Sequence, residues 1–154
     1  MIQRKQTLYL LLAFVATVVC LVLPLGSIEL QGMGVEPVLY NMALVEQGNS
    51  GASYTFTYAP LAVLLVLAAI AELIAIFLYK NRVRQARLCI WTMVLLFAWQ
   101  LLFFYFDYFD LNEIGYFSRS ITSIFPSVSI LLVFLAHRGI RADERLVRSA
   151  DRIR

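Results

Sequence analysis

Long apolar runs alternate with shorter polar segments along the chain, and four of the runs are long enough to cross a membrane. A helix of about 20 apolar residues, rising about 1.5 Å per residue, spans a hydrocarbon layer of about 30 Å. We therefore predict membrane-spanning helices over residues 7–25, 58–79, 88–106 and 120–137. The fourth run is the shortest and the richest in hydroxyl groups, and Pro126 within it predicts a kink.

The first run has some features of a secretory signal peptide, because Arg4 and Lys5 precede it. Its apolar stretch is longer than such signals use, and no small-residue cleavage site follows. We expect an uncleaved first span, with a cleaved leader as the minor alternative.

The polar segment over residues 26–57 carries strand and turn patterns. "SIEL" and "SYTFTY" alternate like half-buried strands, and "QGMG" and "QGNSG" are typical of turns. These patterns predict a small antiparallel β element of two or three strands in an extracytoplasmic loop. The second outer segment, "DYFDLNEIGYFSRS", is rich in aromatic residues, which favours a belt at the lipid headgroups. A binding lip formed with the first loop is the alternative.

Charge is distributed unevenly between the polar segments, and this predicts an orientation. Lysine and arginine are retained on the cytoplasmic side of short membrane loops. Twelve of the 13 basic residues lie in the two terminal segments or between the second and third runs: Arg4, Lys5, Lys80, Arg82, Arg84, Arg87, Arg138, Arg141, Arg145, Arg148, Arg152 and Arg154. The other segments hold Glu29, Glu36, Glu46, Asp107, Asp110 and Glu113 against Arg119. Both termini are therefore expected in the cytoplasm.

The hydrophobic content of 61% and the mean hydropathy of +0.77 agree with a membrane protein, since soluble domains hold about 45–50% apolar residues. Topology and anionic lipid headgroups account for the sequence pI of about 9, so we expect no nucleic-acid partner. The candidate contacts with lipid or a protein partner on the cytoplasmic side are Lys80, Arg82, Arg84, Arg87, Arg138, Arg141, Arg145, Arg148 and Arg152.

The polar candidates inside the predicted spans are Glu72, Gln100 and Ser129. An acid within a span is costly and is a functional candidate. The small residues Ala68, Ala71 and Ala75 lie on the same side as Glu72, so this side is expected to face protein. We favour a structural carboxyl that hydrogen-bonds to a hydroxyl or a backbone carbonyl across the bundle; a proton-relay or ion-binding carboxylate is the alternative. Ser129 is expected at a similar depth, whereas Gln100 lies nearer the outer face and is not expected to pair with Glu72.

Catalytic motifs are scarce. His137 is the single histidine, which leaves a histidine-rich metal cluster or a bis-histidine haem without ligands. The chain contains no Walker loop, GxGxxG or GxSxG motif. Cys20 and Cys89 are predicted at depths too different for a disulfide, whose Cα atoms lie within about 7 Å. We expect no enzyme activity, no metal, no cofactor and no intramolecular disulfide.

The last segment, "RGIRADERLVRSADRIR", predicts an amphipathic cytoplasmic helix over residues 138–154 with a hinge at Gly139. Arginines recur at three and four residues and form one stripe, which suits anionic lipid. An apolar face, broken by Asp143, lies opposite and offers a surface for a partner. With Ile140, its members are Leu146, Val147, Ala150 and Ile153.

Three stretches carry a resemblance to a known family: "MIQRKQTLYLLLA", "FLYKNRVRQARLC" and "FPSVSILLVFLAHRGIRADERLVRSADRIR". Over essentially its whole length the chain resembles Bacteroidetes membrane proteins catalogued as a domain of unknown function, number 4293. The resemblance implies a four-span protein of the bacterial inner membrane, and it supplies no catalytic residue.

The expected fold is an all-α membrane protein: a four-transmembrane-helix bundle with a small extracytoplasmic antiparallel β element in the first loop and a C-terminal amphipathic cytoplasmic helix. The missing catalytic motifs and the charged cytoplasmic segments favour a non-catalytic accessory or scaffold subunit of a membrane complex. The alternative is a small transporter or proton-coupled membrane protein centred on Glu72.

Overall fold

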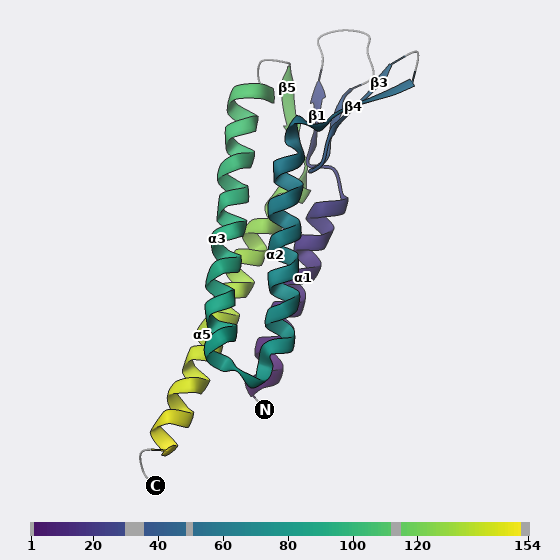
Figure 1. The fold of residues 1–154 in the computed structure, drawn as a ribbon. Helices are drawn as coiled ribbons and strands as arrows, with labels where there is room; N and C mark the ends of the chain where they lie inside the picture. The colour runs from purple at the N-terminus through teal and green to yellow at the C-terminus, as the bar shows by residue number, and fades with distance from the viewer. Residues whose placement is uncertain (1, 30–35, 49–50, 112–114, 152–154) are drawn as a thin grey trace.

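Long helices build the body of the molecule in the computed structural model, which describes residues 2–29, 36–48, 51–111 and 115–151. The helices α1 (Ile2–Val22), α2 (Ala59–Phe77), α3 (Arg82–Phe106) and α5 (Phe125–Asp151) form a four-helix bundle (Figure 1). α1 and α3 each pack against both α2 and α5. All four helical segments are long and apolar enough to cross a membrane. The two chain termini lie at the same end of the bundle (Figure 1).

The helices extend beyond the predicted runs at the end of the bundle that carries the termini. α1 begins at Ile2 and α3 at Arg82, inside segments that are polar in sequence, because no glycine or proline interrupts the helical hydrogen bonds there. At the other end, α1 stops at Val22, two residues before Pro24. The short turns η1 (Phe56–Tyr58), η2 (Leu78–Lys80) and η4 (Ile121–Ile124) are 3₁₀ helices, and η3 (Asp107–Leu111) is a π-helical extension of α3.

Two predictions about the last helix are wrong. Pro126 produces no kink, because it lies in the first turn of α5, where the missing N–H has no helical acceptor to lose. Gly139 is no hinge, because α5 runs unbroken from Phe125 to Asp151. This glycine instead allows α1 to come close: a Cβ added there would lie 3.1 Å from Cγ of Gln6.

A five-stranded antiparallel sheet stands on the opposite end of the bundle (Figure 1). Its order is β4-β3-β2-β1-β5. The strands are β1 (Gly26–Glu29), β2 (Val38–Leu39), β3 (Leu44–Gly48), β4 (Gly51–Thr55) and β5 (Tyr116–Arg119). The strand patterns "SIEL" and "SYTFTY" overlap β1 and β4. The predicted small antiparallel sheet is confirmed, but the expected two or three strands are too few. The first loop supplies four strands, and the second outer segment supplies β5.

The pairing of β1 with β5 joins the two outer segments. Its register runs from Gly26 opposite Arg119 to Glu29 opposite Tyr116. Gly26 is required for this close pairing, because a Cβ there would lie 2.5 Å from both a ring carbon of Phe117 and the carbonyl oxygen of Ser118. The backbone N–H of Ser120 continues the contact by donating to Leu25 O at 2.8 Å.

The buried apolar side chains form two clusters along the bundle. The outer cluster joins the underside of the sheet to the helices and includes Ile28, Leu39, Leu65, Trp99 and Phe117. The inner cluster, nearer the termini, includes Leu10, Ala75, Cys89, Val133 and Ile140. Cys20 and Cys89 belong to different clusters, and both are free thiols. Polar side chains lie between the two clusters and form the candidate site.

Candidate functional site

A polar layer crosses the bundle between the two apolar clusters, and each long helix contributes one residue to it. The layer consists of Thr17 from α1, Glu72 from α2, Thr92 from α3 and Ser129 from α5, all of them buried. Glu72 is fully buried between Ala68 and Ala75, as the small residues around it predict. The sequence pointed to Glu72 and Ser129 but not to the two threonines. A single threonine in an apolar span is common, and its role becomes visible only when helix packing brings its hydroxyl to another polar group.

The Thr17 hydroxyl is the centre of this polar layer. It lies 3.3 Å from Glu72 Oε1, 3.1 Å from Ser129 Oγ and 3.1 Å from the carbonyl oxygen of Ala13. A hydroxyl has one hydrogen, so Thr17 donates to one of these acceptors at a time. Ser129 Oγ donates to the same Ala13 carbonyl at 3.1 Å. The predicted contact of Glu72 with a hydroxyl across the bundle is confirmed, with Thr17 as the partner.

One oxygen of Glu72 remains without a partner. Oε2 is buried and makes no hydrogen bond within the described residues. Thr92, the fourth member of the layer, donates to Leu88 O of its own helix at 3.0 Å and so adds no donor to the carboxyl group. The arrangement is a carboxyl group surrounded by hydroxyl and carbonyl oxygens, and its chemistry suits a proton or one small monovalent cation.

Gln100 occupies a different place. Its Oε1 accepts a hydrogen bond from Ser127 Oγ of α5 at 2.9 Å, whereas Ser129 contacts Thr17 and Ala13. The expectation that Gln100 and Glu72 do not pair is confirmed. The three candidates therefore divide between the buried layer, which holds Glu72 and Ser129, and a second polar site at Gln100.

This second site is a pocket between α3 and the start of α5, which we call the Gln100 pocket. Its volume is about 490 Å³, and its lining includes Gln100, Phe103, Phe104, Arg119, Ser123 and Ile124. A smaller cavity of about 340 Å³ lies across β5 and shares Arg119 and Ser120 with it. Unlike the polar layer, the Gln100 pocket has room for a ligand.

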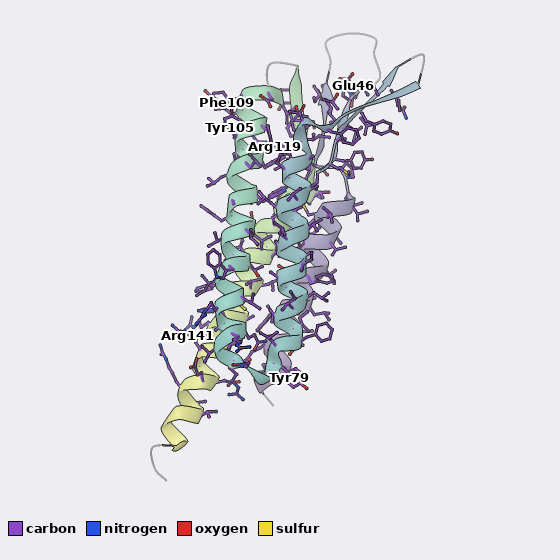
Figure 2. The ribbon with its side chains drawn as sticks, viewed as in Figure 1. Glu46, Tyr79, Tyr105, Phe109, Arg119 and Arg141 are labelled. Atoms are coloured by element: carbon purple, nitrogen blue, oxygen red, sulfur yellow. The ribbon has the colours of Figure 1, made fainter. Side chains whose placement is uncertain are left out.

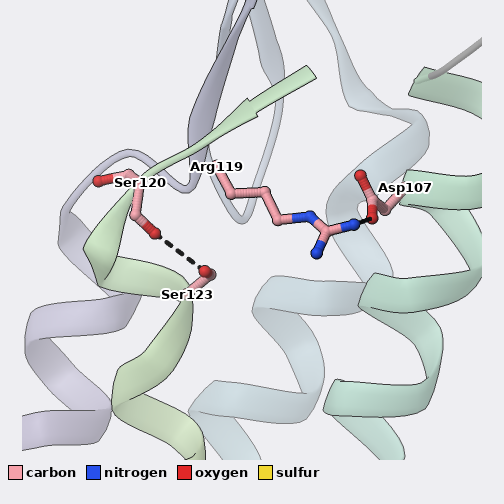
Figure 3. Close-up of polar contacts among 4 residues, drawn as sticks. All are labelled: Asp107, Arg119, Ser120 and Ser123. Atoms are coloured by element: carbon pink, nitrogen blue, oxygen red, sulfur yellow. Dashed lines mark hydrogen bonds and ion pairs between the residues drawn. The ribbon is translucent and has the colours of Figure 1, made fainter. Parts of the chain in front are cut away.

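Arg119 forms an edge of the Gln100 pocket and is held by an ion pair. Its guanidinium donates from Nη2 to Oδ2 of Asp107 at the end of α3 (Figure 3). Asp107 is buried, while the arginine side chain is about half exposed. The guanidinium carbon also lies 6.0 Å from the centre of the Phe104 ring. Below it, the Ser123 hydroxyl donates to Ser120 O at 2.9 Å, which closes the turn that leads into α5 (Figure 3).

Asn41 connects the outer loop to three helices, and sequence analysis missed it. Its Nδ2 donates to Cys20 O of α1 at 2.6 Å, and its Oδ1 accepts from Trp99 Nε1 of α3 at 3.0 Å. Its backbone carbonyl accepts from Ala62 N of α2 at 3.2 Å. An asparagine in a polar loop has no local feature that reveals such a role.

The basic candidates gather at the end of the bundle opposite the sheet. Arg141 and Tyr79 lie toward that end, and Arg119 and Glu46 lie toward the other (Figure 2). Arg84, Arg87, Arg138, Arg141 and Arg145 are exposed, and Arg82 is half-buried. The candidate contacts at Lys80, Arg148 and Arg152 lie outside the described side chains.

The predicted apolar face of the tail divides into two parts. Ile140 is buried in the inner cluster, and Asp143 is buried because its Oδ2 accepts from Gln6 Nε2 at 2.9 Å. Leu146 and Val147 follow on the part of α5 that projects beyond the bundle, and they are 61% and 48% exposed (Figure 1). The candidates Ala150 and Ile153 lie outside the described side chains.

The sequence matches the model of one protein family over nearly its whole length. The model of the family described as a domain of unknown function (DUF4293) matches residues 2–153. The chain belongs to this family. No curated protein matches the sequence.

The DUF4293 chain offers little for metal chemistry in the part that is described. Among residues 2–29, 36–48, 51–111 and 115–151, no three His, Cys, Asp or Glu side chains lie together as a metal-binding group. The polar layer of this DUF4293 protein has one carboxyl group, and the Gln100 pocket has one ion pair.

Proposed function

We propose that this DUF4293 protein is integral to a bacterial inner membrane. Support comes from the apolar side chains on the outer faces of all four long helices, which include Leu8, Phe77, Trp91, Leu101 and Leu131, each more than half exposed. Soluble monomers rarely expose apolar patches of more than a few hundred Å². Lipid covers such faces, and helices satisfy their own backbone hydrogen bonds in it.

The same proposal includes an orientation with both termini in the cytoplasm. The exposed residues Arg84, Arg87, Arg138, Arg141 and Arg145 lie at the end of the bundle that holds the termini. Glu29 and Glu46 lie on the sheet at the other end, where the exposed Arg119 is paired with Asp107. Basic residues favour the cytoplasmic side and attract anionic headgroups there. A cysteine introduced at exposed Arg145 should react with an impermeant thiol reagent only after the membrane is opened, and one at exposed Ala52 should react in intact spheroplasts.

Within the membrane, we propose a non-catalytic role as an accessory or scaffold subunit of a membrane-protein complex. The observation that carries this role is the continuation of a packing seam beyond the bundle. Residues of α5 that face the bundle recur at three and four residues: Val133, Ala136, Ile140 and Asp143. The next position in this series is Val147, where the bundle has ended and the side chain is exposed. A helix of a partner protein would continue the packing there.

The test is native mass spectrometry of the full chain, purified from its own membranes in a mild detergent. Val147→Asp should remove a stoichiometric protein partner that is present with the unmodified chain. Ala142→Asp is the matched control, because it adds the same charge at an exposed position about 140° around the helix from Val147. An isolated monomer under every gentle condition, or equal loss of the partner in the control, would count against the proposal.

Glu72 supports a second candidate function, a small transporter or proton-coupled protein. The supporting observation is the buried Oε2 atom that has no partner within the described residues. An ionisable residue within a membrane-spanning segment is a candidate for an ion or proton pathway. Glu72→Gln keeps the shape of the side chain, so loss of the cellular phenotype with assembly intact would favour this function, and a normal phenotype would remove it.

A further inference from the structure

The Gln100 pocket combines polar and apolar walls in a volume suited to a ligand. Binding sites for small molecules commonly enclose about 300–1,000 Å³ and place a few polar groups in an apolar lining. The pocket, at about 490 Å³, falls within this range. We propose that it binds one lipid molecule, an acyl chain that ends in an anionic oxygen headgroup. The proposal rests on the insertion of the helices in a membrane.

The polar wall offers hydrogen-bond donors. Gln100 Oε1 already accepts from Ser127, so the group that this amide has left for a ligand is its NH2 donor. Arg119 reaches the same pocket from β5 with a guanidinium that carries five N–H groups, and its contact with one oxygen of Asp107 leaves further donors. Anionic oxygen atoms fit such donors, because charge-assisted hydrogen bonds are about twice as strong as neutral ones.

The apolar wall provides a path for the acyl chain. Phe103 is buried at the back of the pocket and stacks on Trp99, with ring centroids 5.2 Å apart. Phe104 and Ile124 line the pocket and are also exposed on the outer faces of α3 and α5. The chain of a bound lipid therefore passes between these two residues into the surrounding hydrocarbon. A wholly polar ligand would leave the aromatic wall unmatched, and a wholly apolar one would leave Arg119 and Gln100 unmatched.

Two natural sources share this chemistry, a phospholipid of the bilayer and a free fatty acid. The two sources can be compared by tryptophan fluorescence with a brominated probe of each kind, because bromine atoms on an acyl chain quench tryptophan emission only at short range. The chain has two tryptophans. Trp91 is 60% exposed on α3, whereas Trp99 is fully buried behind Phe103. In the Trp91→Phe variant, Trp99 is the single reporter of the pocket.

The full chain with Trp91→Phe is placed in vesicles of unlabelled neutral lipid, and brominated phosphatidylglycerol or brominated oleic acid is added. We expect saturable quenching of Trp99 by one or both probes, and the stronger probe identifies the source. Ile124→Phe fills the mouth of the pocket and should abolish the quenching. Val128→Phe adds a ring to the lipid-exposed face of the same helix, outside the pocket lining, and should leave quenching unchanged. Gln100→Leu should raise the half-saturating concentration about fivefold, as expected for one lost hydrogen bond.

The outcomes that overturn the proposal are distinct. Equal quenching in the Ile124→Phe and Val128→Phe variants, or none with either probe, removes the pocket as a lipid site. Equal saturation by brominated diacylglycerol, which lacks the anionic oxygen, removes recognition of the headgroup. The unmodified chain contains both tryptophans, so the difference between its quenching and that of the Trp91→Phe variant measures the quenching of Trp91. If Trp91 is not quenched by bulk brominated lipid, membrane insertion itself fails; if Trp91 is quenched and Trp99 is not, the pocket proposal alone fails.

Discussion

The polar layer and the Gln100 pocket lie in the same bundle, yet they satisfy their polar groups in opposite ways. In the layer, Thr17, Glu72 and Ser129 are fully buried, and Thr17 contacts both of the other two. In the pocket, Gln100 is half-buried and Arg119 is half exposed beside open space. Most polar atoms of the closed layer find partners within the protein, although Glu72 Oε2 has none among the described residues, whereas the open pocket has donors left for a ligand. Substitutions in the layer are therefore expected to act mainly on stability, and the pocket is the place where we propose a ligand.

Asn41 should have the largest effect on stability, because it holds α3 against α1 and α3 forms the back wall of the pocket. Asn41→Ala removes the acceptor of Trp99 Nε1 and the donor to Cys20 O, so two buried groups lose their partners. We expect a loss of about 3 kcal/mol in the free energy of unfolding, measured by SDS titration in mixed micelles. Met42→Ala, at the exposed neighbouring position, should change this free energy by less than about 0.5 kcal/mol. Equal effects of the two substitutions would contradict the assigned role.

A substitution in the polar layer should have the next largest effect. Thr17→Val keeps the shape but removes the hydroxyl shared by Glu72 and Ser129. The expected cost is about 2 kcal/mol in the same titration, because buried polar atoms lose their partner. Thr92→Val is the control within the layer, since that hydroxyl bonds to its own helix. Its cost should be less than half as large, and a larger cost would place the centre of the layer at α3.

At the edge of the pocket, the ion pair should contribute less. Arg119→Gln leaves the buried carboxyl of Asp107 without its cation, but the arginine side chain is 55% exposed and water screens the pair. We expect a cost of about 1 kcal/mol, between the values typical of exposed and buried pairs. The double variant with Asp107→Asn should recover part of that loss. No recovery would show that the two side chains act independently.

The smallest effect is expected inside the pocket. Ser127→Ala removes one partly exposed hydrogen bond to Gln100 Oε1. The stability should change by less than about 1 kcal/mol. Saturation of Trp99 quenching is the more sensitive measurement, because the freed Gln100 amide can turn away from the pocket. A stability loss as large as that of Thr17→Val would erase the distinction between the closed and the open site.

Local patterns predicted the elements better than their partners. The apolar runs predicted all four long helices, and the small residues around Glu72 predicted its burial. The same patterns could not reveal β5, whose four residues become a strand through pairing with β1 about 90 positions earlier in the chain. They also placed Ile140 on a partner face, whereas the inner cluster covers it.

The sequence alone determined where the helices form and how charge separates between the two ends of the molecule. Both properties are local, because helix periodicity and span length depend on neighbouring residues. Tertiary structure alone decided that Thr17 meets Glu72, that Gln6 meets Asp143, and that Gln100 borders a pocket. Gln6 and Asp143 are 137 positions apart, and nothing in either local segment specifies the other. Such pairs arise only when helices pack and buried polar atoms must find partners away from water.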